Sequence, residues 1–146
     1  MRSLFMALAV LLVMSGATLA HHVPLPDAAS DSDAFALYLT EQTAQSDGVV
    51  TRFMAYKYGK AEERSDLAKD AQSALVVTIE HMDGLDVRPC FATYAGLVDE
   101  FLATLVRYFE VVGASPALAE ALFAYAGNLY AALTASVTET VAACAP

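Results

Sequence analysis

The sequence has no tryptophan, only two cysteines and few basic residues, and each shortage excludes a class of protein. Eight Lys and Arg against 17 Asp and Glu give a formal net charge of -9, which is the wrong sign for binding the phosphates of nucleic acid. Two cysteines are too few for a disulfide-stapled miniprotein or a four-cysteine zinc site. Charged residues make up 17% of the chain and apolar residues 57%, which excludes intrinsic disorder. The 146 residues fit one folded domain.

The common signatures of catalytic and cofactor sites are missing as well. The sequence contains no CxxCH haem-attachment motif, no HExxH zinc motif, no GxSxG nucleophile turn and no glycine-rich phosphate loop. It also lacks the Glu-x-x-His pair of a di-iron bundle. We therefore expect a protein that needs no cofactor and is not an enzyme.

The first 20 residues have the pattern of a secretory signal peptide. Arg2 supplies a positive charge, residues 4–14 form an unbroken apolar run, and mostly small residues follow at positions 15–20. The apolar run is too short to span a bilayer. We predict cleavage after Ala20, with Ala17 as the alternative site. The mature protein is then secreted or periplasmic and has no integral membrane segment.

Residues 21–31 include two prolines and show no periodicity, so we interpret them as an extended N-terminal arm. From 32 to 146, apolar residues recur at helical spacing, and no strand-like alternation is present. Turn residues near Gly59, at 83–84 and at 113–116 divide this part into four helices with short connections. We therefore predict an all-α fold: a single antiparallel four-helix-bundle-like domain.

The third and fourth predicted helices have contrasting apolar patterns. The third has a heptad-like seam with alternating spacings of three and four: Phe91, Tyr94, Val98, Phe101, Leu105, Tyr108 and Val112. The fourth, over 117–140, is apolar on almost every side, and polar residues within it favour a buried bundle helix over a membrane span. It also has a strip of small residues that predicts close approach of a neighbouring helix: Gly127, Ala131 and Ala135.

The two cysteines lie at the outer ends of these two helices. Cys90 begins the third helix and Cys144 follows the fourth, so antiparallel packing brings them to the same end. In an exported protein such a pair is expected to form a disulfide bond. Because the fourth helix is predicted to be the longer one, we expect residues 141–144 to unwind or fold back. A catalytic or metal-binding thiol pair is the less favoured alternative, since no CxxC spacing or nearby histidine supports it.

Two candidate binding surfaces follow from the apolar helices. A small-molecule pocket is suggested by polar groups on the apolar faces of the third and fourth helices: Tyr94, Tyr108, Tyr125 and Asn128. Ordinary core packing with bonded hydroxyls explains these tyrosines equally simply. A second apolar face of the fourth helix is predicted to mediate self-association or partner binding, unless the arm or the first helix covers it: Tyr130, Leu133 and Val137.

The histidines offer a third possibility. After cleavage at Ala20, His21 and His22 would begin the mature chain, where an amine beside imidazoles can chelate Cu(II). A solvated N-terminus is the simpler interpretation. His81 has acidic sequence neighbours and could be a general base, but a histidine in the last turn of a helix needs no such role.

Together these patterns favour a secreted or periplasmic accessory protein that binds an unknown protein partner or forms a homodimer, without catalysis. One alternative is a carrier of a small apolar ligand in the tyrosine-lined pocket. The other is a copper-binding or enzymatic protein that uses the N-terminal histidines.

Overall fold

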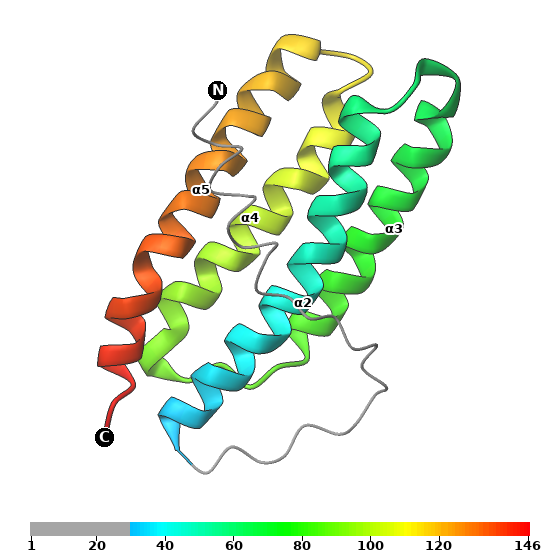
Figure 1. Cartoon of the computed structure of the whole chain (residues 1–146). Coiled ribbons are helices and arrows are strands. Elements are labelled where there is room, and N and C mark those ends of the chain that lie inside the picture. Colours follow the sequence, from blue (N-terminus) through cyan, green and yellow to red (C-terminus); the bar gives the residue numbers. More distant parts are fainter. Residues whose placement is uncertain (1–29) are drawn as a thin grey trace.

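The structure is a computed structural model that describes residues 30–146. This part of the chain consists of four α-helices, two short 3-10 helices and no strand, so the all-α prediction is confirmed. The elements are α2 (Asp31–Tyr58), η1 (Ala61–Glu63), α3 (Arg64–Asp83), η2 (Pro89–Phe91), α4 (Ala92–Val111) and α5 (Pro116–Ala143). Consecutive helices run in opposite directions (Figure 1), and the most extensive packing is between α2 and α3 and between α4 and α5. The predicted signal peptide and all but the last two residues of the predicted arm lie outside the described residues.

Local sequence signals set both ends of α2. The Ser30 hydroxyl accepts a hydrogen bond from the Asp33 backbone N–H at 3.1 Å, which caps the first turn. At the other end, a Cβ at Gly59 would overlap the Ala55 carbonyl oxygen and the Leu67 side chain. A glycine is therefore required where the chain leaves α2 and α3 begins to pack against it.

Helix α4 is the centre of the core. Every residue of its predicted seam from Phe91 to Tyr108 is buried, and Val112 is half-buried. Within the described residues, one helix (89–111) is long and apolar enough to cross a membrane by length and composition alone, and 44% of its apolar stretch is buried in the fold. That degree of burial is also expected of a core helix.

Helix α5 is more exposed than its apolar sequence predicts. Its buried positions are few: Ala119, Ala126, Leu129, Leu133 and Thr140. The prediction that small residues mark a close helix contact is wrong at Ala131 and Ala135, because both are exposed. Alanine is the strongest helix former and has little apolar surface, so an exposed alanine face is tolerated.

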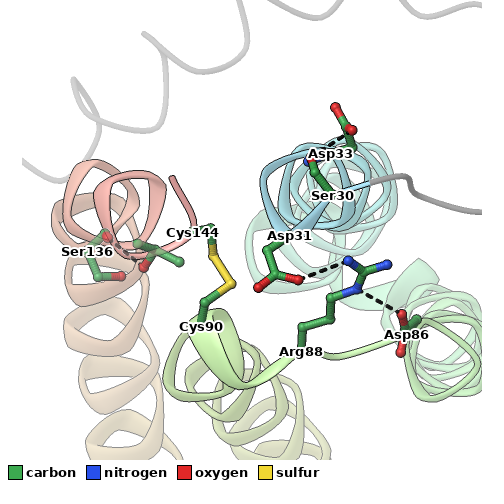
Figure 2. The surroundings of a disulfide bond; sticks show 9 residues. Ser30, Asp31, Asp33, Asp86, Arg88, Cys90, Ser136 and Cys144 are labelled. Atoms are coloured by element: carbon green, nitrogen blue, oxygen red, sulfur yellow. Dashed lines mark hydrogen bonds and ion pairs between the residues drawn. A yellow bond between two sulfur atoms is a disulfide. The ribbon is translucent and has the colours of Figure 1, made fainter. Parts of the chain in front are cut away.

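At one end of the fold, a disulfide bond joins the start of the α4 segment to the end of α5. Cys90 and Cys144 are bonded with a Cα–Cα distance of 5.2 Å, which confirms the predicted pairing (Figure 2). The expected unwinding of residues 141–144 is wrong. Helix α5 continues to Ala143, and the Cys144 N–H donates to the Thr140 carbonyl at 3.0 Å. The extra length of α5 is matched because η2 adds a turn before α4 and contains Cys90.

The start of α2 is held at this same end by an arginine. The Arg88 guanidinium lies 2.9 Å from the Asp31 carboxylate at the start of α2 and 3.3 Å from that of Asp86 (Figure 2). Because Cys90 follows two residues later, the loop before α4 anchors both the beginning of α2 and the end of α5.

At the opposite end, aromatic rings and an ion pair hold α2 against α5. The Phe53 ring stacks on that of Phe123, with centroids 5.8 Å apart and an interplanar angle of 8°. Lys57 Nζ lies 4.1 Å from the Phe123 ring centroid and 2.6 Å from the Glu120 carboxylate. The α2 and α5 helices are thus fixed relative to each other at both ends.

Candidate binding groove

Between these two fixed ends, α2 and α5 form the walls of an apolar groove of about 390 Å³. At the disulfide end, Figure 2 shows α2 and α5 on either side of the α4 segment. The lining side chains are Leu39, Gln42, Thr43, Ser46, Asp47, Val50, Thr51 and Met54 of α2, Tyr94 of α4, and Tyr130, Leu133, Thr134 and Val137 of α5.

The α2 wall is formed by one face of that helix. Leu39, Thr43, Val50 and Met54 recur three or four residues apart or at multiples of a turn, which places them on a common face. Although Asp47 and Gly48 are residues common in turns, α2 is continuous to Tyr58. The groove therefore has one straight wall that extends over about 22 Å, the rise of a helix from residue 39 to residue 54.

The α5 wall contains all three residues of the predicted interaction face. Leu133 is only 3% exposed, whereas Tyr130 and Val137 are half-buried. These side chains line a groove and do not form a flat outer surface. Their predicted role in self-association or partner binding stays a prediction, since the structure describes a single chain.

The floor of the groove contains a closed polar network. The Tyr94 hydroxyl donates to Gln42 Oε1 at 3.0 Å, and Gln42 Nε2 donates to Ser46 Oγ at 2.9 Å. All three side chains are buried. Because the buried polar groups satisfy one another, the floor is stable without a ligand.

Two polar residues in the sequence indicate this network, although helical periodicity alone does not identify it. Gln42 and Ser46 fall at helical spacing within the apolar stripe of α2, between Leu39 and Val49. Polar residues on a buried face require hydrogen-bond partners. Their partner, Tyr94, lies on another helix 52 residues away in the chain, so the sequence could not identify it.

Asp47 and Tyr130 face the groove from opposite walls. Asp47 is half-buried and is the only charged residue among the lining residues. Burial raises the pKa of Tyr130, and the negative charge of Asp47 raises it further. The carboxylate of Asp47 and the phenol of Tyr130 therefore belong to the lining of the same groove, one on α2 and the other on α5.

Burial of Tyr94 predicts a loss of stability at alkaline pH. Burial, with a smaller effect of Tyr130, raises the pKa of the Tyr94 phenol to about 12, whereas a tyrosine in the unfolded chain titrates near 10. Between these values the unfolded state binds fewer protons than the folded state. The free energy of unfolding therefore falls as the pH rises through this interval, by up to about 1.4 kcal/mol per pH unit for this group.

Guanidinium unfolding at pH 9, about 10.5 and about 11.5, followed by circular dichroism, measures this effect. Tyr94→Phe is expected to make the decline with pH shallower, because one titrating phenol is removed. An equally steep decline in the wild-type protein and in Tyr94→Phe would show that Tyr94 does not contribute.

The residues predicted to form a tyrosine-lined pocket are not brought together. Tyr94 lies in the groove, whereas Tyr108 packs against Phe53 with ring centroids 4.9 Å apart. Tyr125 is 44% exposed and its hydroxyl donates to Glu100, and Asn128 is exposed. Because α5 is apolar all round, spacing alone did not show which of its faces points inward.

His81 has a partner that its sequence neighbours did not suggest. Its Nε2 lies 2.9 Å from a carboxylate oxygen of Glu41, so the pair connects α3 with α2. Both side chains are partly buried. The contact explains His81 as a bridge between two helices and gives no reason to assign it as a general base.

No metal site is formed within residues 30–146, where no group of three or more His, Cys, Asp or Glu side chains is placed to hold an ion. The proposed copper ligands His21 and His22 lie outside the described residues. No protein-family model matches the chain, and neither a curated protein nor a solved structure gives a significant match.

Proposed function

We propose that this is a secreted or periplasmic, non-catalytic helical-bundle protein that carries a small apolar molecule in the groove between α2 and α5. The observation that supports this function most directly is the groove itself. Its volume of about 390 Å³ lies within the range of small-molecule sites, and its lining is mainly apolar with a few polar groups.

Export is supported by two independent features. The first 20 residues have the charge, apolar run and small residues of a cleavable signal peptide. The bond between Cys90 and Cys144 is of the kind that persists in oxidising compartments. A binding protein with a preformed groove and a covalent crosslink suits that environment.

The depth of the groove favours a small molecule over a protein partner. The lining comes from three helices, with α2 and α5 as walls and Tyr94 of α4 at the floor, so a flat protein surface laid across α2 and α5 does not reach the floor. A narrow molecule that enters between the walls contacts it. The copper-binding or enzymatic alternative depends on His21 and His22, which lie outside the described residues, and it stays a prediction.

A second candidate function is self-association or partner binding through α5. The observation that favours it is the exposure of large apolar side chains along this helix: Leu118 at 48%, Tyr125 at 44% and Val141 at 50%. A dimer mass in native mass spectrometry that reverts to the monomer in Tyr125→Glu would support this candidate.

The carrier function is tested with the neutral fluorescent probe N-phenyl-1-naphthylamine and two matched substitutions on α5. Thr134 is exposed and lines the groove, so Thr134→Phe places a ring in the groove without changing the core. Thr138 is exposed one turn later and is not part of the lining, so Thr138→Phe is the control.

We expect the wild-type protein and Thr138→Phe to enhance the fluorescence of the probe with equal affinity. Thr134→Phe is expected to weaken binding by about tenfold or more, because the added ring occupies the site. Equal binding by all three proteins, or no binding by the wild-type protein, would contradict the carrier function.

A further inference from the structure

We propose that the groove selects amphiphiles with a cationic head group, which Asp47 and Tyr130 hold while the apolar tail lies along the α2 wall. This inference rests on the proposed carrier function and specifies the chemical class of the ligand. It follows from the charge of the lining, the arrangement at Asp47, and the apolar walls on either side of it.

The charge of the lining excludes anionic head groups. Among the described residues that line the groove, none is Lys, Arg or His, and Asp47 is the only carboxylic acid. A fatty-acid carboxylate placed here would meet a like charge in a partly desolvated site, with no cation to offset the repulsion. A cation would have a favourable interaction at the same position.

Asp47 has the properties of an anchor for such a cation. It is half-buried, and it forms no ion pair with any residue of the described chain, whereas Asp70 is paired with Arg52 and Glu120 with Lys57. An unpaired carboxylate next to an apolar surface gains more from a ligand cation than a fully solvated one does.

Tyr130 complements this carboxylate from the opposite wall. A tyrosine ring attracts an ammonium group through its negative face, as the Phe123 ring does for Lys57 within this fold. A carboxylate on one side and an aromatic ring on the other form a site suited to an alkylated ammonium, which has little need of hydrogen-bond acceptors.

The apolar walls accommodate the tail. On α2, Val50 and Met54 extend about 10 Å from Asp47 towards the aromatic end, the rise of seven helical residues. On α5, which runs in the opposite direction to α2 (Figure 1), Leu133 and Val137 lead from Tyr130 toward the disulfide end, where Leu39 lies on the α2 wall, so apolar surface is present on both sides of the head-group position. A linear alkyl chain fits a groove bounded by two straight helices better than a rounded molecule does.

The test compares decyltrimethylammonium with decanoate, which have tails of similar length and opposite charges. Isothermal titration calorimetry at pH 7, below the micelle concentration of each compound, gives both affinities. We expect the wild-type protein to bind the ammonium about tenfold or more tightly than decanoate.

Three variants separate a specific head-group site from the general attraction of an acidic protein. Asp47→Asn is expected to remove most of the preference for the ammonium, and Asp47→Glu to restore part of it. Asp66→Asn makes the same change of net charge on α3, outside the groove, and is expected to leave the preference unchanged. Thermal melting of each variant verifies that it is folded.

Binding of the neutral probe N-phenyl-1-naphthylamine distinguishes a failure of the cationic head-group site from a failure of the carrier function. Loss of the ammonium preference in Asp47→Asn with unchanged binding of the neutral probe supports the head-group site. If the neutral probe binds in the groove but the ammonium and decanoate bind equally, or Asp66→Asn and Asp47→Asn have the same effect, the cationic selectivity is wrong and the carrier function stands. If the neutral probe does not bind, both proposals fail.

Discussion

Replacing both cysteines by alanine, Cys90→Ala with Cys144→Ala, is expected to lower the free energy of unfolding by about 4 kcal/mol. The disulfide bond joins residues separated by 54 positions, and it stabilises the fold chiefly by restricting the unfolded chain. For a domain of this size the loss corresponds to a decrease in Tm of about 15 °C. Differential scanning calorimetry of the oxidised wild-type protein and the double variant measures it.

Reduction of the wild-type protein provides the matched control. There are no free cysteines in the described chain, so a reducing agent such as tris(2-carboxyethyl)phosphine acts on this one bond. The reduced wild-type protein and the double variant are expected to melt at nearly the same temperature. A double variant that melts with the oxidised wild-type protein would show that the crosslink contributes little to stability.

The second large effect is expected at the other end of the fold. Phe53 is 4% exposed, and its ring contacts those of Tyr108, Phe109 and Phe123, so it joins α2 to both α4 and α5. Phe53→Ala leaves a cavity among these rings and is expected to cost about 4 kcal/mol. Guanidinium unfolding followed by circular dichroism gives the value.

A substitution of similar kind on the surface serves as the comparison for Phe53→Ala. Val77 on α3 is 60% exposed, so Val77→Ala is expected to change the free energy of unfolding by no more than about 0.5 kcal/mol. Similar losses in the two variants would mean that the aromatic cluster is not a principal source of stability.

Much of the local structure could be predicted from the sequence, because the signals involved act between near neighbours. The helix predicted between the turns near Gly59 and at 83–84 is found at Arg64–Asp83, and the one predicted over 117–140 is found at Pro116–Ala143. Serine caps, prolines in first turns and glycines after last turns mark these boundaries within a few residues. The seam of α4 was equally clear, because its apolar residues keep to one face.

The groove could not be predicted, because it depends on which faces of distant helices meet. Tyr130, Leu133 and Val137 were identified as a distinct apolar face of α5, but not as the wall opposite Leu39 and Val50. The residues chosen for a pocket included only one that lines the groove, Tyr94. An all-round apolar helix has no polar side to show its orientation.

The sequence by itself determined the helices, their approximate ends and the pairing of the only two cysteines. Tertiary structure alone decided the contacts between residues far apart in the chain, such as Tyr94 with Gln42, His81 with Glu41 and Lys57 with Glu120. The reason is physical. Capping and periodicity are short-range effects, whereas the orientation of each helix about its axis depends on how all the side chains of the core pack together.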